Sequence, residues 1–321
     1  TCDGLDNDCD EQIDEGVAKV FDPGAVTMEE TQPAHRGRWP MVAGAPGAWL
    51  YGGLHRGQDL EAKSSVVLDD LWSFDLVTGA WSKAETLSVE TPGPRWGHAV
   101  AWLPELEVLL VSGGFQGVSG EQPPKSDLWA YFVQTQSWSL VNQESDSELP
   151  QERAWHSLTA VGPQTLLLAG GGAAHPTWLG SMTQSPDEPS SLTCTWESVA
   201  AGPVGRSRHA TVYREATNEV WLLGGAVEGA SPVSVLSLDD PSAWTTPLGN
   251  GELPGSVQDA CAAISGEAVM MFGGRKKAPG ESPYESASLP TIWSLTQGDS
   301  GWQSDEIIVD EPVAMAGCLA I

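Results

Sequence analysis

Apolar and polar residues along this chain follow a unit that returns five times. In each unit an apolar run ends in Gly-Gly, and about 25 residues later a single Trp follows. The glycine pairs are Gly52-Gly53, Gly113-Gly114, Gly170-Gly171, Gly224-Gly225 and Gly273-Gly274, and the tryptophans are Trp81, Trp138, Trp196, Trp244 and Trp302. A period of roughly 50 to 60 residues predicts stacked structural units.

Each unit contains the pattern of four β-strands. It opens with a Pro, an Arg three residues later, and a His or a substitute three residues after that. These triplets are Pro33, Arg36 and Trp39; Pro92, Arg95 and His98; Pro150, Arg153 and His156; and Pro203, Arg206 and His209. An apolar strand such as HAVAWL follows, then the strand ending in Gly-Gly, a third such as LWSFDL, and a fourth led by the Trp. Four strands per unit are typical of a propeller blade.

Over nearly 290 residues this pattern resembles the kelch repeat. The resemblance implies an all-β, kelch-type β-propeller of four-stranded blades over residues 33–321, with five complete repeats and the first strand of a sixth. We expect the glycine pairs to let the backbone pass where a side chain would clash, and the tryptophans to fill the space between blades.

Three irregularities interrupt the repeat. The position nine residues before the trailing Trp holds Trp72, Trp129, Val235 and Trp293, whereas the third unit is interpreted as lacking it and carrying the insertion TQSPDEPSS. The fifth unit keeps Pro254 but lacks the Arg and His, with Cys261 assigned to the His position. Pro312 and Cys318 restart the repeat, and VAMAGCLAI is interpreted as its first strand. We expect the rest of a sixth blade to come from further chain or from another polypeptide.

Residues 1–16, TCDGLDNDCDEQIDEG, resemble no later stretch and are rich in oxygen ligands. The predicted metal ligands are Asp6, Asp8, Asp10, Gln12, Asp14 and Glu15. Such spacing suits calcium, which takes six or more oxygens from a short loop. Glu11 stands where such loops have glycine, Val17 stands where a bidentate Glu is expected, and a disordered acidic tail is the alternative. Cys2 and Cys9 bracket the loop closely enough for a disulfide, and residues 17–32 are interpreted as a linker.

The run from Cys2 to Asp10 resembles the Cys-Asp-Gly-x-Asp-Asn-Asp-Cys-Asp metal-binding motif of secreted and surface proteins of myxobacteria and related bacteria. The resemblance covers about 16 residues. It implies an exported bacterial protein, extracellular or at the cell surface, that binds a divalent metal.

The formal net charge of −28, from 43 acidic and 15 basic residues, argues against nucleic acid and anionic membranes as partners, because both bind basic patches. No apolar run approaches the length of a membrane span. The chain begins at Thr1 without a signal peptide, and we expect a mature or trimmed form.

First-strand positions form a predicted ring of Trp39, His98, His156, His209, Cys261 and Cys318. Such a ring suits a transition metal, but Arg-x-x-His belongs to the repeat itself, so structural hydrogen bonds by the histidines are favoured and a transition-metal cofactor is not expected. Cys261 and Cys318 at matching heights are interpreted as buried thiols, with a bridge as the alternative. Cys194 has no evident partner.

Long loops after Gly53, Gly114 and Gly274 are expected on one face of the propeller, where a protein or glycan partner would bind. Arg275, Lys276 and Lys277 form the basic run of an acidic protein, interpreted as solvated charge, with contact to a carboxylated partner as the alternative. The sequence has no nucleophile motif or phosphate loop.

These observations favour an exported, calcium-stabilised kelch propeller that is a binding or structural module, with a place as a subunit of a cell-surface assembly and no enzymatic activity. The alternative is an extracellular carbohydrate-active or oxidising enzyme with its site on a propeller face. A piece of a longer surface protein is the third hypothesis.

Overall fold

The structure is a computed structural model that describes residues 31–308, except for 35, 38–39, 46, 56–64, 121, 173–174, 202–205, 227–230, 248–256, 277–290 and 299–300. Its contacts divide the chain into the units Thr1–Thr31 and Gln32–Ile321, and every described strand lies in the second unit. The predicted metal loop with Cys2 and Cys9 lies outside the described residues.

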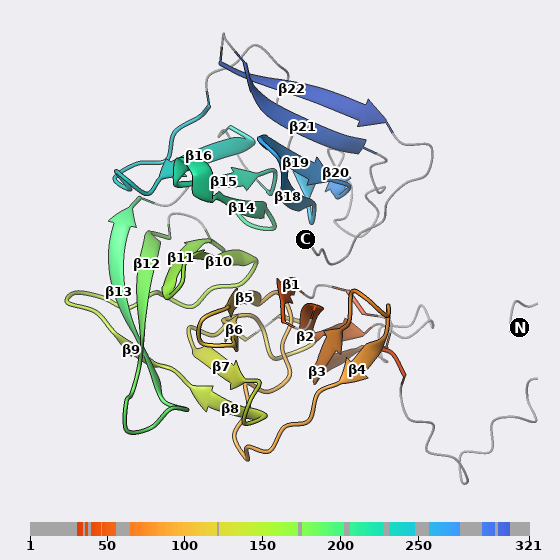
Figure 1. Cartoon of the computed structure of the whole chain (residues 1–321), viewed down its shortest axis with the longest axis vertical. Coiled ribbons are helices and arrows are strands. Elements are labelled where there is room, and N and C mark those ends of the chain that lie inside the picture. The colour runs from red at the N-terminus through yellow and green to blue at the C-terminus, as the bar shows by residue number, and fades with distance from the viewer. Residues whose placement is uncertain are drawn as a thin grey trace, which may run out of the picture. The chain divides into compact units, whose positions relative to one another are not determined.

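The described residues form consecutive antiparallel sheets, coloured from orange to blue in chain order in Figure 1. Blade 1 contains β1 (Met41–Gly44), β2 (Gly47–His55), β3 (Val66–Phe74) and β4 (Trp81–Lys83). Blade 2 contains β5 (Ala99–Leu103), β6 (Val108–Ser112), β7 (Leu128–Phe132) and β8 (Ser137–Leu140). Blade 3 contains β10 (His156–Gly162), β11 (Thr165–Gly170), β12 (Thr177–Gln184) and β13 (Leu192–Ala200). In each of these blades the first strand is innermost, and the fourth is outermost in blades 1 and 2.

The last two blades follow the same order. Blade 4 contains β14 (Ala210–Arg214), the 3-10 turn η2 (Glu215–Thr217), β15 (Glu219–Leu223) and β16 (Val233–Ser237). A bridge from Val235 to Thr245 replaces its fourth strand. Blade 5 contains β18 (Cys261–Ser265), β19 (Ala268–Phe272), β21 (Thr291–Gly298) and β22 (Gly301–Ile308). The all-β blade architecture predicted from the repeat is therefore confirmed over the described residues.

Two further pairings join the blades. β9 (Asn142–Glu144), which follows blade 2, adds a parallel fifth strand to the outer edge of blade 3 beside β13. The Nε1 of Trp196 donates to the side chain of Gln143 at 2.9 Å across this pairing. A short pair, β17 (Val257–Gln258) and β20 (Arg275–Lys276), lies beside blade 5.

The core consists of four apolar layers, one at each interface between successive blades. Their trailing tryptophans are Trp138 between blades 1 and 2, Trp196 between 2 and 3, Trp244 between 3 and 4, and Trp302 between 4 and 5. The expectation that the trailing tryptophans fill the interblade space is confirmed for these four, whereas Trp81 belongs to none of the layers. The innermost strands β1, β5, β10, β14 and β18 pack side by side in this order, while β18 and β1 have no comparable contact in the described part of the chain.

Each interface contains the same backbone joint at a glycine pair. The N–H of the second glycine donates to a carbonyl of the next blade, as from Gly114 to Arg153 at 3.0 Å. A Cβ on Gly113 would lie 2.5 Å from that carbonyl oxygen, and its φ of +61° suits glycine. The glycines are therefore required where one blade approaches the next.

The arginine of each opening motif braces the glycine pair of its own blade. Nη1 of Arg95 donates to the carbonyl of Gly113 at 3.0 Å, and its guanidinium also holds Asp127 at 2.9 and 3.1 Å. Arg36 pairs with Asp70 in the same way. Arg153 and Arg206 keep the bond to glycine but have no carboxylate partner among the described residues, and burial lowers the pKa of each to about 10.

The strand register corrects three residue assignments that were predicted from spacing along the sequence, one each in blades 3, 4 and 5. Trp178 pairs with Leu168 as Trp129 pairs with Val111, so the third unit keeps this Trp and its insertion only extends the β12–β13 hairpin. In blade 4 the matching residue is Ser234, one position before Val235. In blade 5 the His position holds Ala260, because its Cβ faces Gly274 as the Cβ of His98 faces Gly114.

Candidate binding site at the channel mouth

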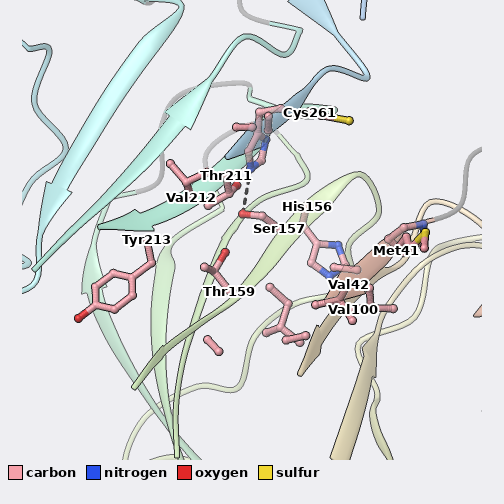
Figure 2. A pocket seen from close by; sticks show the side chains of 18 of the residues that line it. Met41, Val42, Val100, His156, Ser157, Thr159, Thr211, Val212, Tyr213 and Cys261 are labelled. Carbon is pink, nitrogen blue, oxygen red and sulfur yellow. Dashed lines mark hydrogen bonds between the residues drawn. The ribbon is translucent and has the colours of Figure 1, made fainter. Parts of the chain in front are cut away.

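The innermost strands line an open cavity of about 620 Å³ along the propeller axis. Figure 2 shows its two kinds of wall: Ser157, Thr159 and Thr211 lie on one side, and Val42 and Val100 on the other. The Oγ1 of Thr211 is buried without a hydrogen-bond partner in the described structure. The first strands of the blades therefore line an axial channel, and its hydroxyl groups lie on blades 3 and 4.

The repeat histidines are wedges between blades. A Cβ on Gly113 of blade 2 would lie 2.8 Å from the Cε1 of His156, and a Cβ on Gly170 of blade 3 would lie 2.6 Å from that of His209. Neither ring nitrogen of His156 has a hydrogen-bond partner in the described structure, and His98 lies near the Tyr51 backbone without hydrogen-bond geometry. His209 alone donates to or accepts from a side chain, Ser157 Oγ at 3.0 Å, dashed in Figure 2. The expectation of one histidine hydrogen bond per blade is therefore confirmed for His209 and contradicted for His156.

Burial keeps these imidazoles neutral. Desolvation, followed by the nearby Arg95 for His98 and Arg206 for His209, lowers the pKa of each ring to about 3. The pKa of His156 also lies well below its usual value because of burial. Within the described residues no three His, Cys, Asp or Glu side chains are grouped to hold a metal ion. Packing between blades accounts for the histidines without a ligand role.

The two described cysteines differ. Cys194 is a free thiol in the core between blades 2 and 3, and burial raises its pKa to about 12. Cys261 is disulfide-bonded, and its partner lies outside the described residues because Cys194 is free. The interpretation of Cys261 as a buried thiol is therefore wrong.

A ladder of backbone hydrogen bonds forms the rim of the channel. Its members are the residues two positions after the repeat arginine or its substitute: Gly97, Trp155, Arg208 and Asp259. The N–H of Trp155 donates to Gly97 O at 2.7 Å, that of Arg208 to Trp155 O at 2.9 Å, and that of Asp259 to Arg208 O at 3.0 Å. All four residues have a φ between +57° and +66°. The ladder holds these side chains at the mouth on a fixed backbone.

The rim side chains form a connected polar and aromatic surface, which we call the mouth site: Trp155, Arg208, Asp259 and Arg275. The guanidinium of Arg208 stacks 4.2 Å from the ring centroid of Trp155 and donates to Asp259 at 3.2 Å. Arg275 donates to the same carboxylate at 2.7 Å. Among the described residues, two arginines therefore share the Asp259 carboxylate at this mouth, although the protein as a whole is strongly acidic.

An aromatic neighbour extends the mouth site toward blade 2. The rings of Trp96 and Trp155 lie 5.3 Å apart, and Trp96 also packs 4.8 Å from Phe115 at the start of the loop after Gly114. Trp96 is buried and its Nε1 donates to Gly117 O at 2.8 Å. This pair anchors the one long loop that is largely described, while the loops at 56–64 and 277–290 lie outside the described residues.

Sequence reasoning found Arg275 but not the mouth site. Arg275 was interpreted as solvated charge, yet it lies in β20, half-buried, in an ion pair with Asp259. The useful signal was the position just before each repeat histidine, where Gly97, Trp155 and Arg208 differ inside an otherwise regular motif. Variation at a fixed place in a repeat marks a side chain that packing does not prescribe.

Comparisons with known proteins agree with this architecture. Residues 21–171 match the model of the KLHDC2/KLHL20/DRC7 kelch-repeats domain. The chain is 28% identical over 287 residues, 84% of its length, to human multiple epidermal growth factor-like domains protein 8. It is 26% identical over 300 residues, 86% of its length, to Arabidopsis thaliana acyl-CoA-binding domain-containing protein 4, and 35% identical over 106 residues, 32% of its length, to mouse kelch domain-containing protein 1.

The chain covers only part of each relative: 9% of the human protein, 42% of the plant protein and 24% of the mouse protein. The fold and the rim residues together define a propeller of repeated blades with an open cavity at one end of its channel. The blade architecture and the match over residues 21–171 support a kelch-type β-propeller fold. No helix among the described residues has the length and hydropathy to cross a membrane.

Proposed function

We propose that this chain is a protein-interaction module that binds a peptide segment of its partner at the mouth site. The observation that carries this proposal is the placement of Trp155, Arg208 and Asp259 at an open cavity on a hydrogen-bonded rim, with Arg275 paired to Asp259. Aromatic and arginine side chains are the residues that supply most of the binding energy in protein interfaces. A rigid backbone beneath them lowers the entropy cost of binding.

The chemistry of the mouth site defines the preferred segment. Asp259 pairs with two guanidiniums, and the partly exposed Arg275 can donate a charge-assisted hydrogen bond to an acidic side chain of the partner. The accessible part of the half-buried Trp155 ring suits an aromatic or aliphatic side chain. We therefore expect short segments that combine acidic and apolar residues.

Selection of a displayed random-peptide library on the purified protein tests the proposal. Enriched peptides are expected to bind the wild type and to lose at least tenfold in affinity for Arg208→Ala and for Trp155→Ala, each checked for its native circular-dichroism spectrum. Glu197→Ala on the exposed outer strand β13 is the matched control and is expected to bind as the wild type does. Failure to enrich any peptide, or equal binding by all variants, would overturn the mouth site as the binding surface.

The metal loop, the export and the cell-surface assembly are proposed from residues 1–16 alone. Asp6, Asp8, Asp10, Gln12, Asp14 and Glu15 would hold calcium, with Cys2 and Cys9 closing the loop. Elemental analysis of chelator-free protein is expected to find one or two calcium ions per chain, and none in an Asp8→Asn, Asp10→Asn variant. A metal content unchanged by these substitutions would remove the loop from the proposal.

A glycan partner, and enzymatic action on a carbohydrate or an oxidisable substrate, are the alternatives. Hydrolysis of a glycosidic bond uses a pair of carboxylates, whereas among the described residues that line the cavity Asp259 is the one carboxylate and two arginines hold it. This observation favours binding over hydrolysis. A glycan array under the same variant set would favour the glycan if it, and not the peptides, depends on Arg208.

A further inference from the structure

Blade 5 has a second apolar face that none of the four interblade layers covers. Ala262, Val269 and Met271 point into the layer shared with blade 4. Side chains alternate along a strand, so their neighbours point the other way. The register places these neighbours on one face, with Cys261, Ala263, Met270, Phe272 and Ile292 as its apolar residues and Ser294 beside Met270. Cys261 is buried and the other four apolar residues are half-buried.

The disulfide of Cys261 indicates what lies on this face. With Cys194 free, the partner of Cys261 is one of Cys2, Cys9 and Cys318. Cys261 begins β18, the innermost strand of blade 5. Its partner segment must therefore approach this strand at the channel end of the blade.

The sequence around Cys318 repeats that around Cys261. Cys261-Ala262-Ala263-Ile264 follows a small residue, and so does Cys318-Leu319-Ala320-Ile321. Neither Cys2 nor Cys9 has an apolar strand pattern around it, because both lie in an acidic stretch. Only the segment VAMAGCLAI offers apolar side chains to an apolar face.

The rim ladder brings equivalent positions of adjacent innermost strands together. Asp259, two residues before Cys261, is hydrogen-bonded at 3.0 Å to Arg208, its equivalent in blade 4. A strand that continued the ladder past Asp259 would place Ala316 at the rim and Cys318 beside Cys261. In an extended segment Ala314, Ala316 and Cys318 share one face, and these small side chains permit the close approach of about 4.4–6.8 Å between Cα atoms that a disulfide needs.

We propose that residues 313–321 pack as a strand on the second apolar face of blade 5 and are tethered there by a disulfide between Cys318 and Cys261. Formation joins the two Sγ atoms and releases both thiol protons. The two electrons pass by thiol–disulfide exchange to a disulfide oxidant, such as oxidised glutathione, which becomes two thiols. This inference does not rest on the proposed mouth site.

Peptide mapping of the purified full chain tests the linkage without any substitution. Free thiols are alkylated in denaturant, and the protein is then digested and analysed by mass spectrometry without reduction. We expect one peptide pair joined through Cys261 and Cys318, and alkylated Cys194 as the internal control. Linkage of Cys261 to Cys2 or Cys9, or alkylated Cys261, overturns the proposal.

Thermal unfolding and hydrogen exchange test the packing. Reductant is expected to lower the melting temperature of the wild type by roughly 5 °C or more, because a long loop is no longer closed. It should leave the melting temperature of a Cys261→Ala, Cys318→Ala variant unchanged. Amides of residues 313–321 should exchange slowly in the oxidised protein. If they exchange as fast as those of an unfolded peptide, the tether exists without the packed strand and the proposal fails.

Discussion

At the scale of single residues, the joint between blades explains the repeat motif. Arginine braces the glycine pair of its own blade, its carbonyl accepts from the preceding blade, and histidine fills the gap between the two. These roles need a planar donor, an absent side chain and a compact ring, which is why the three residue types recur at fixed spacing. None of these roles requires a ligand.

The neutral histidines predict an acid-sensitive fold. Because His98, His156 and His209 have folded-state pKa values far below the unfolded value of about 6.5, the unfolded chain binds protons first as the pH falls. Their contribution is complete above pH 6.5 and is lost toward pH 3. Below pH 6 the free energy of unfolding should fall by about 1.4 kcal/mol per pH unit for each histidine.

Urea unfolding between pH 7.5 and 5.5 measures this slope, before most carboxylates titrate. His175 also has a lowered pKa because of burial, so His209→Gln, which removes one of four such rings, should reduce the slope by about a quarter to a third. A free energy of unfolding that stays constant over this range would contradict the conclusion that the buried histidines are neutral in the folded protein.

The glycine joint predicts a large effect from one methyl group. Gly113→Ala should destabilise the fold by about 3 kcal/mol or more, because its Cβ would lie 2.5 Å from Arg153 O in addition to the strain of a positive φ. Gly79→Ala is the matched control, with a similar φ of +69° and no atom within 4 Å, and should cost only about 1 kcal/mol. Equal losses in chemical denaturation would show that backbone strain, and not the joint, decides.

At the scale of the elements, each blade keeps its own strand order while the interfaces carry the core. The β12–β13 hairpin shows this separation: the insertion lengthens the hairpin at its tip, and Trp178 remains buried between blades 2 and 3. Additions at hairpin tips are tolerated because they leave the interblade layer unchanged.

Substitution of Trp178 measures how much one interblade layer contributes to the free energy of unfolding. Trp178→Ala should lower the free energy of unfolding by about 3–5 kcal/mol, since the side chain is 2% exposed and fills the layer. Trp81→Ala, at a half-buried tryptophan of the outer strand β4, should cost clearly less. Denaturant titration of both variants measures the difference, and a smaller loss for Trp178→Ala would contradict the register in blade 3.

At the scale of the whole molecule, repulsion between acidic side chains opposes the packing of the blades. The net charge is −28, so these side chains repel one another in the compact folded state, and salt screens that repulsion. Raising sodium chloride from 20 to 500 mM shortens the distance over which charges repel each other. The melting temperature should therefore rise by a few degrees. Potassium chloride should act equally. A melting temperature that falls with both salts would mean that ion pairs such as Arg95–Asp127 outweigh the net repulsion.

The repeat alone was enough to predict blades, the role of the glycine pairs and the interblade tryptophans, because these depend on spacing within one unit of chain. Spacing did not reveal which strand positions face each other, so Trp178, Ser234 and Ala260 became clear only from the pairing register. The mouth site was also decided by tertiary structure: Trp155, Arg208 and Arg275 lie in three different units of the repeat, and only the closure of neighbouring blades along the rim ladder brings them together.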